Sequence, residues 1–244
     1  MELILDFGNT SKKIALFDTG DLVLYQQYQE ITLDIIRAFF ENNPGIKSCI
    51  LSSVIHHTAF IDEFLVSSVP TWILDSHTPV PIHNGYRTPG TLGIDRLAAA
   101  VAGAYKFPGK PVLVITAGTA ITYDFINPSG EYLGGAISPG MQLRFKALHT
   151  FTGKLPLVEY KESIQVIGND TENSILSGVI NGIVGEMETF AVRLNAEYPE
   201  LNIILSGGDL NYFVKRLKIN IFAVSNIVLT GLHQILLFNV NRTP

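Results

Sequence analysis

The stretch PVLVITAGTAITYDFI, residues 111–126, repeats the layout of LILDFGNTSKK, residues 3–13. In both stretches an apolar run ends in a polar residue, and a turn with one glycine and small polar residues follows. Apolar runs bounded by such turns are typical of buried β-strands. The repeat therefore predicts two lobes, 1–110 and 111–244, that each open with a β-hairpin.

Predicted strands and helices alternate along the chain after the first hairpin. Apolar and alternating runs predict strands at 2–6, 13–18 and 22–28, in SCILSSV (48–54) and in TWILD (71–75). Helical periodicity with clear stop signals predicts helices at 32–42, in TAFIDEFLVSS (58–68) and in IDRLAAAVAGAYKF (94–107). This alternation predicts an α/β fold.

Composition and charge narrow the class of partner. The chain has 244 residues, of which 47% are hydrophobic and 16% charged, and its formal net charge is -5. Because the balance is acidic and no run is rich in Lys and Arg, we expect no nucleic-acid partner. The high hydrophobic share predicts a buried interface in addition to a core.

Three further features predict a cytoplasmic protein. The single cysteine, Cys49, excludes an internal disulfide, as is usual in a reducing compartment. The chain opens directly with a strand pattern, without the basic and cleavage segments of a signal peptide. Its longest apolar stretches look too short to span a bilayer, so we expect no membrane partner.

The first hairpin carries the groups of a phosphate-binding turn. Gly8 allows a sharp turn and a close approach of the backbone to a ligand. The Asn9 and Thr10 side chains and the backbone N–H groups can donate to phosphate oxygens, and Lys13 can neutralise them. Asp6 can supply a hard oxygen for Mg²⁺ or its water ligands. The Walker pattern GxxxxGK[ST] is absent from the sequence, and an ordinary hairpin with a polar turn remains the alternative.

A set of ordered motifs gives this chain a family resemblance. The motifs are DFGNTSKK, YRTPGTLGIDR, AGTAIT, YLGGAISPGM, GKLP, GNDTENSILSG and LSGGD. In order and spacing they resemble the type III pantothenate kinases, within the superfamily of acetate kinase, sugar kinases, Hsp70 and actin. The resemblance covers nearly the whole chain. It implies two ribonuclease-H-like lobes, built from duplicated ββαβ-type units, with a nucleotide cleft between them.

The resemblance also implies an activity and its requirements. Members of the family transfer the γ-phosphate of ATP to the primary hydroxyl of pantothenate, the first step of coenzyme A biosynthesis. They use a divalent metal such as Mg²⁺ with ATP, a monovalent cation (K⁺ or NH₄⁺), and a cytoplasmic homodimer. Two alternatives stay open: a related superfamily kinase for another small acid or sugar, and a nucleotide-binding regulator without catalysis.

The matched motifs imply the site residues. The residues assigned to ATP and its phosphates are Asp6, Phe7, Gly8, Asn9, Thr10, Ser11, Lys12, Lys13 and Thr119. Adjacent strand residues point to opposite faces, and the family's lysine falls at Lys13, so we expect Lys13 rather than Lys12 to contact phosphate. The residues assigned to pantothenate are Tyr86, Gly93, Ile94, Asp95, Arg96 and Thr171, the last reaching the neighbouring subunit's site.

Three of these assignments compete with a simpler structural role. The resemblance makes Asp95 the general base for the substrate hydroxyl, but an acid at a helix start is often a cap. Arg96 is a charged fork suited to a carboxylate or phosphate, and would otherwise be a surface charge. Thr171 would otherwise be a helix N-cap, with Asn173 and Ser174 as rivals.

One position departs from the family pattern. The second hairpin normally begins with an aspartate that binds the monovalent cation, and this sequence has Thr116 there. A threonine hydroxyl offers lone pairs but no charge. We therefore expect a weakened dependence on the cation, unless nearby carbonyls or Asp124 compensate.

Other residues give weaker signals. His56 and His57 are adjacent, whereas a metal pair on a helix is spaced by three or four residues. Glu186 and Glu188 are interpreted as the solvated face of a helix. The glycine pair of LSGGD fits either a close approach to adenosine or a plain turn from strand to helix.

Overall fold

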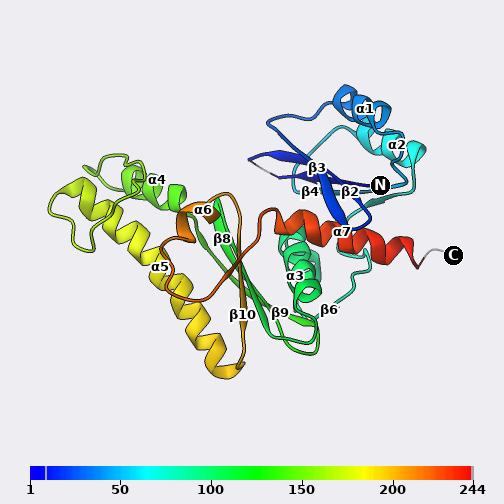
Figure 1. Ribbon diagram of the computed structural model, residues 1–244. Helices are drawn as coiled ribbons and strands as arrows, with labels where there is room; N and C mark the ends of the chain where they lie inside the picture. Colours follow the sequence, from blue (N-terminus) through cyan, green and yellow to red (C-terminus); the bar gives the residue numbers. More distant parts are fainter. Residues whose placement is uncertain (9, 243–244) are drawn as a thin grey trace. The chain divides into compact units, whose positions relative to one another are not determined.

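The computed structural model describes residues 1–8 and 10–242 (Figure 1). By contacts the chain divides into two units, one formed by Met1–Tyr105 with Ile227–Pro244 and the other by Lys106–Asn226. The change of unit at Tyr105 lies close to the predicted boundary between residues 110 and 111. Asn9, which the resemblance assigns to phosphate binding, lies outside the described residues.

The first unit is built on a five-stranded sheet with the order β3-β2-β1-β4-β5. Its strands are β1 (Glu2–Phe7), β2 (Lys12–Asp18), β3 (Asp21–Tyr28), β4 (Ser48–Ser53) and β5 (Thr71–Ile73). The first three form an antiparallel meander, and β4 and β5 add in parallel beside β1. The predicted strands are confirmed, with ends that differ by a residue or two.

The first unit also contains helices. They are α1 (Leu33–Asn42), α2 (Ala59–Ser68), α3 (Ile94–Lys106) and α7 (Ile227–Val240), and the connection into α3 holds the short elements β6 (His83–Asn84) and η1 (Pro89–Thr91). Thr32 caps α1, because its side chain accepts the backbone N–H of Ile35. The three helices predicted before residue 110 are confirmed.

Helix α7 belongs to the first unit although it closes the chain. It packs against β1 and β4. Its buried His233 stacks on Phe17 of β2, with ring centroids 4.2 Å apart. The predicted division at residues 110 and 111 placed this segment in the second lobe. Whether the two lobes behave as separate domains stays a prediction.

In the second unit, the strands β9-β8-β7-β10-β11 of a six-stranded sheet repeat the strand order of the first sheet. Its strands are β7 (Val112–Ala117), β8 (Ala120–Ile126), β9 (Glu131–Pro139), β10 (Asn202–Ser206) and β11 (Phe222–Ala223). Again three strands form an antiparallel meander, β10 adds in parallel to β7, and β11 adds in parallel to β10. The predicted duplication is confirmed, and each sheet has the strand order of a ribonuclease-H-like fold.

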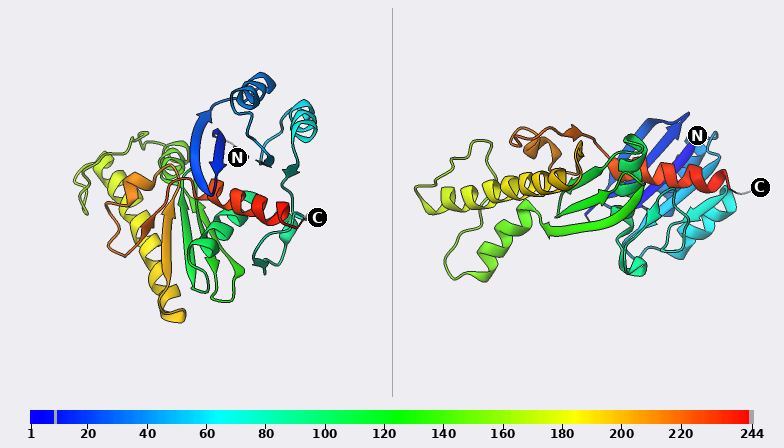
Figure 2. Two further views of the ribbon diagram at one scale, coloured as in Figure 1. Left: turned by 45° about the vertical axis from the view of Figure 1, so that its right-hand side comes forward. Right: turned by 90° about the horizontal axis from the view of Figure 1, so that it is seen from below.

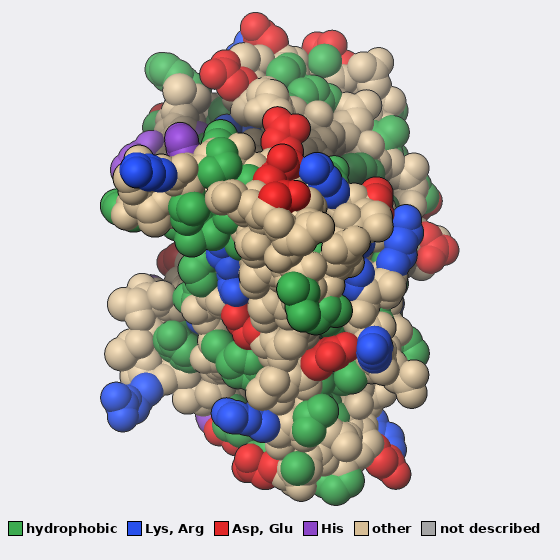
Figure 3. Space-filling view, turned by 90° about the vertical axis from the view of Figure 1, so that its left-hand side faces the viewer, with side chains coloured by type: hydrophobic (Ala, Val, Ile, Leu, Met, Phe, Trp, Pro, Cys, Tyr) green, Lys and Arg blue, Asp and Glu red, His purple; other side chains and the backbone are tan. Residues whose placement is uncertain are grey.

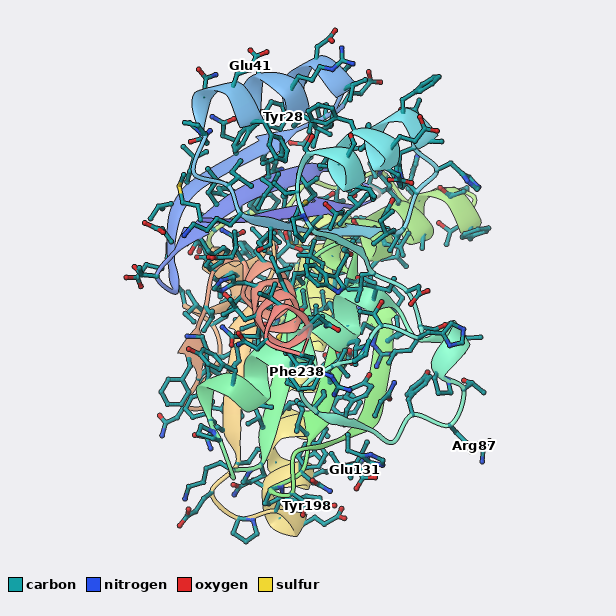
Figure 4. All side chains as sticks on the ribbon, turned by 90° about the vertical axis from the view of Figure 1, so that its right-hand side faces the viewer. Tyr28, Glu41, Arg87, Glu131, Tyr198 and Phe238 are labelled. Carbon is teal, nitrogen blue, oxygen red and sulfur yellow. The ribbon has the colours of Figure 1, made fainter. Side chains whose placement is uncertain are left out.

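A long helix covers one face of the second sheet (Figure 2). The helices of this unit are α4 (Met141–Phe151), α5 (Thr171–Glu197) and α6 (Leu210–Phe213). Phe190 of α5 stacks on Tyr123 of β8, with ring centroids 4.2 Å apart. At the end of the helix Tyr198 contacts Phe125 and lies near Glu131, as Figure 4 shows.

Among the described residues, α5 is the one helix whose length and composition would allow it to cross a membrane. The expectation that every apolar stretch is too short is therefore wrong for this helix. In the structure, 44% of its most apolar 18-residue window is buried. Core helices of soluble proteins meet the same criterion, so this feature alone is weak evidence for a membrane span.

Candidate active site

The first hairpin closes in a tight turn between β1 and β2. In the register of the two strands, Asp6 lies opposite Lys13. The N–H of Gly8 donates to the carbonyl of Ser11 over 3.1 Å. A Cβ at position 8 would lie 3.1 Å from the same oxygen, so only glycine fits comfortably. The next described residue, Thr10, is exposed.

Asp6 and Lys13 form an ion pair beside this turn. Lys13 Nζ lies 3.4 Å from Asp6 Oδ2, and Asp6 is only 8% exposed. Burial raises the pKa of Asp6, the Lys13 charge opposes that change, and the charge of Asp95 adds to it. The fold thus brings the start of α3 within electrostatic reach of the hairpin. Two motifs far apart in the sequence therefore lie within electrostatic range of each other in one unit.

Asp95 lies in the first turn of α3 with an exposed side chain. Its Oδ1 accepts the backbone N–H of Arg96 over 2.9 Å. A Cβ at position 93 would lie 2.7 Å from that oxygen, so Gly93 provides the space into which the carboxylate folds. The acid therefore serves as a local cap and also presents its carboxylate to solvent.

Arg96 is buried, with 6% of its surface exposed, so the surface-charge alternative is wrong. Its Cζ lies 5.9 Å from the centre of the Tyr86 ring, a cation–π contact. The N–H of Tyr86 donates to Asn84 Oδ1 over 3.0 Å and so fixes the loop. Arg87, the next residue, is exposed and extends away from the loop (Figure 4).

The second turn joins β7 to β8 and is tighter than the first, with two residues between its strands instead of four. The N–H of Gly118 donates to the carbonyl of Ala120 over 3.0 Å. The side chain of Thr119 is exposed, and its carbonyl accepts the N–H of Gly140 over 3.0 Å. A Cβ at Gly140 would overlap the carbonyl of Gly118. The start of α4 therefore supports this turn from behind.

The glycine pair of LSGGD supports the same turn from β10. Gly207 has a φ of +100°, and a Cβ there would overlap the carbonyl of Ala117. The N–H of Asp209 donates to that carbonyl over 3.1 Å. Burial raises the pKa of the Asp209 carboxyl. Gly207 is therefore required because two loops of the second unit pack closely there.

Thr116 carries a buried hydroxyl near the end of β7. Within the described part of the chain, its Oγ1 has no hydrogen-bond partner. Asp124 of β8 is also buried, and its carboxylate accepts the hydroxyl of Tyr132 over 2.8 Å. Its compensation for the missing charge stays a prediction. A buried oxygen with lone pairs fits the ligand of a monovalent cation, but it brings no charge.

The described residues contain no cluster of three or more His, Cys, Asp or Glu side chains that could hold a metal. Mg²⁺ commonly keeps several waters and binds mainly to substrate phosphates with one or two carboxylates. Asp6, a single buried carboxylate beside the phosphate-type turn, fits that role.

Thr171 is the first residue of α5 and is not its cap. Asp170 caps the helix, because its carboxylate accepts the backbone N–H of Asn173 over 2.8 Å. The hydrogen bonds from Asn173 lower the pKa of Asp170. Thr171 is exposed at a groove of about 1020 Å³ between α4, α5 and the loop before α5. The groove is also lined by Arg144, Leu148, Gly168, Ile175 and Gly178.

The sequence interpretation missed one polar network in the second unit. Glu186, predicted on a solvated helix face, is only 24% exposed and accepts hydrogen bonds from Tyr123 and Arg144. The partners lie 63 and 42 residues away in the chain. Glu188 accepts the backbone N–H of Lys218 over 2.7 Å. No local pattern signals these contacts, because they form only when the sheet and helices pack.

Comparisons with known proteins agree along the full chain. A model of the type III pantothenate kinase family matches residues 2–193. A type III pantothenate kinase from Bacteroides fragilis is 44% identical over 243 residues, which cover 99% of this chain and 100% of that protein. Another from Phocaeicola vulgatus is 46% identical over 241 residues, with 98% and 99% covered.

Solved structures share the fold at lower identity. A conserved putative Baf family transcriptional activator from Campylobacter jejuni has a TM-score of 0.63 at 21% identity, with 98% of this chain and 99% of that one covered. Lmo2764, a putative N-acetylmannosamine kinase from Listeria monocytogenes, has a TM-score of 0.55 at 14% identity and the same coverage. These likenesses agree with the duplicated ribonuclease-H-like units.

Proposed function

The chain belongs to the type III pantothenate kinase family, and on that premise we propose which of its residues carry the reaction. The enzyme transfers the γ-phosphate of ATP to the primary hydroxyl of pantothenate, in coenzyme A biosynthesis. The observation that carries the residue assignment is the Asp6–Lys13 ion pair, which lies within electrostatic range of Asp95 in the first unit.

Asp95 is the proposed general base. Its carboxylate is exposed and is held at one oxygen by the N–H of Arg96, which fixes its direction. From there it can orient the substrate hydroxyl and accept its proton. Phosphoryl transfer needs little covalent help from the protein, so orientation is the larger part of this role.

The pantothenate wall is proposed to comprise Tyr86, Gly93, Ile94 and Arg96. Arg96 is held against Tyr86, and its planar fork suits the carboxylate of pantothenate. Gly93 supports this wall because its missing side chain leaves room for Asp95.

Both glycine turns are proposed to bind ATP phosphates. Each turn offers backbone N–H groups and a threonine, Thr10 in the first and Thr119 in the second. Lys13 adds a positive charge to the first turn, which also includes Phe7, Gly8, Asn9, Ser11 and Lys12. A divalent metal bound with ATP would neutralise phosphate charge, and Asp6 would hold it through water.

The monovalent cation is proposed to bind weakly at Thr116. The support is the buried Thr116 hydroxyl, which lacks a hydrogen-bond partner in the described chain and carries no charge. A neutral oxygen attracts a cation less than a carboxylate does, and the difference is largest where water is excluded.

The working assembly is proposed to be a cytoplasmic homodimer without nucleic-acid or membrane partners, in which Thr171 reaches the partner's pantothenate site. Apolar side chains at the end of α4 and in the loop before α5 are strongly exposed, with Phe151 at 85%, Val166 at 81% and Ile167 at 79%. Figure 3 shows hydrophobic side chains at the surface among charged ones. A second copy of the chain would cover such a surface.

A related kinase or a regulator without catalysis are the alternatives. The relative from C. jejuni carries a description as a putative transcriptional activator, but it shares only the fold at 21% identity. The presence of Asp6, Lys13, Asp95 and Arg96 favours catalysis in this chain.

A coupled ADP-release assay tests the proposal. We expect ADP release with pantothenate but not with glucose, N-acetylmannosamine or short carboxylic acids, and a product phosphorylated at the primary hydroxyl by mass spectrometry and NMR. Asp95→Asn from the same preparation controls for contaminating kinases. Turnover of a sugar but not of pantothenate would favour the related kinase, and nucleotide binding without turnover would favour the regulator.

A further inference from the structure

A charged network joins the second sheet to α4 and α5. Arg144 Nη2 donates to Glu186 Oε2 over 2.6 Å and to Ser138 Oγ over 2.8 Å. Ser138 Oγ donates to Glu186 Oε2 over 3.1 Å, and the Tyr123 hydroxyl donates to Glu186 Oε1 over 2.8 Å. Both carboxylate oxygens of Glu186 are thus engaged. The side chains of Arg144 and Glu186 are 21% and 24% exposed, so solvent screens the pair only partly.

The protonation states fit this arrangement. Burial raises the pKa of Glu186, but the hydrogen bonds from Arg144, Tyr123 and Ser138 outweigh that effect and lower it. Burial and the neighbouring Glu186 both raise the pKa of Tyr123. At neutral pH the network therefore contains a carboxylate, a guanidinium and a neutral phenol that donates.

The network extends to the second glycine turn through Arg144. Its Nε donates to the carbonyl of Pro139 over 2.8 Å, and its backbone N–H donates to the carbonyl of Gly140 over 3.0 Å. Gly140 in turn donates to the carbonyl of Thr119 over 3.0 Å. A continuous chain of hydrogen bonds thus runs from Glu186 on α5 to the turn that carries Thr119.

Stability alone gives little reason for a charged pair at this place. Taking both charges out of water offsets much of their attraction, and an apolar pair of similar volume is often as stable. What an apolar pair lacks is direction, because only the guanidinium fork can bond Glu186, Ser138 and the Pro139 carbonyl at once.

We propose that Arg144 and Glu186 are positioning residues that hold the second glycine turn in place for ATP. Glu186 fixes the fork of Arg144, Arg144 fixes the junction of β9 and α4, and that junction fixes the carbonyl of Thr119. The inference rests on the proposed contact between Thr119 and an ATP phosphate.

Steady-state kinetics of two variants test this inference. Glu186→Gln keeps the shape of the side chain and removes its charge. The double variant Arg144→Met with Glu186→Leu replaces the pair by apolar groups. In both variants we expect the KM for ATP to rise about tenfold, because the loss of one charge-assisted hydrogen bond has about this effect. The KM for pantothenate should stay within about twofold.

Thermal unfolding separates positioning from stability. Glu186→Gln should unfold at a lower temperature, because Arg144 loses its charged partner. The double variant should recover most of that loss and still show the raised KM for ATP. The matched control is Lys110→Met with Glu200→Leu, which removes an exposed ion pair of 2.6 Å from the same unit and should change neither constant.

The variant Thr119→Ala separates the positioning role of Arg144 and Glu186 from the phosphate contact of Thr119. A raised KM for ATP in Thr119→Ala, with wild-type values in a stable double variant, would overturn the positioning role and leave the phosphate contact intact. A wild-type KM for ATP in Thr119→Ala would overturn the phosphate contact itself, and with it the positioning role.

Discussion

The Asp95 carboxylate occupies space that is free because Gly93 has no side chain. The space beside its Oδ1 would hold the Cβ of residue 93, and the backbone N–H of Arg96 binds the same oxygen. The arrangement keeps a carboxylate at the start of a helix in a fixed direction while its side chain remains exposed. A catalytic acid or base gains from such fixation, because orientation is the main contribution to phosphoryl transfer.

Asp95→Asn should lower kcat by about 10²- to 10⁴-fold, because the amide cannot accept the substrate proton. The asparagine oxygen can still accept the N–H of Arg96, so the local fold and the binding of pantothenate should persist. Isothermal titration with pantothenate and steady-state rates measure both effects. Near-normal turnover in the variant would remove Asp95 from the role of base.

Lys13→Ala should raise the KM for ATP about tenfold or more, whereas Lys12→Ala should change it less than about twofold. Lys13 lies opposite Asp6 and pairs with it at 3.4 Å, and Lys12 points to the other face of the same strand. The two variants control for each other, since each removes one lysine from one strand. Equal effects, or a larger effect of Lys12→Ala, would show that the phosphates do not lie on the Lys13 face of the strand.

Thr116→Asp should strengthen the response to K⁺ or NH₄⁺ in a sodium-free buffer with a bulky organic cation. The wild type should respond weakly, because its buried Thr116 hydroxyl has no charge. The variant should also unfold at a lower temperature in the bulky-cation buffer and recover with K⁺, since its carboxylate is buried without a partner until the cation binds. Strong, saturable activation of the wild type at low K⁺, unchanged by the substitution, would contradict this view.

At the scale of elements, two helices cross closely in the first unit. A Cβ at Gly231 of α7 would overlap the carbonyl of Ala98 on α3, so the helix backbones touch there. The contact joins the last helix of the chain to the helix whose first turn carries Asp95. The crossing of α3 with α7 therefore depends on residues more than half the chain apart, whereas the start of α3 is held by its own neighbours.

Gly231→Ala should destabilise the protein by about 1–3 kcal/mol, because the two backbones must separate to admit a methyl group. Gln234→Ala lies on the same helix, removes a partly exposed side chain and should stay within about 0.5 kcal/mol of the wild type. Urea unfolding curves of the three proteins measure the difference. Equal stability of Gly231→Ala and the wild type would mean that the helices can part without cost.

At the scale of the whole molecule, several large apolar side chains of the described chain lie at its surface. Phe151, Val166 and Ile167 are strongly exposed, and α5 presents the small residues Gly178, Gly182 and Gly185 without a neighbouring atom in the positions of their absent side chains. Such a surface is typical of an interface rather than of a monomer.

Sedimentation should show a dimer for the wild type and a monomer for Gly182→Arg, because a charge on the exposed face of α5 would have to be buried in the interface. The monomer should also lose activity with pantothenate if Thr171 completes the partner's site. Ser67→Arg, an exposed change on α2 that adds the same single charge, is the control. An active wild-type monomer at working concentration would refute the homodimer.

The sequence by itself determined the α/β class, the first strands and helices, and the duplicated hairpins. Each of these depends on a local pattern: an apolar period, a stop signal, or a glycine between small polar residues. The motifs also determined the family, because type III pantothenate kinases match the chain over nearly its full length. The assignments of individual site residues stay predictions.

Only the tertiary structure decided where distant segments meet. It placed α7 with the first unit, buried Arg96 against Tyr86, joined Glu186 to Arg144, and left the Thr116 hydroxyl buried without a hydrogen-bond partner in the described chain. Sequence patterns report a residue's own turn or strand, and burial depends on what packs against it from elsewhere in the chain. The sequence therefore predicts that Glu186 is solvated, and only the packing of α5 on the second sheet shows that it is not.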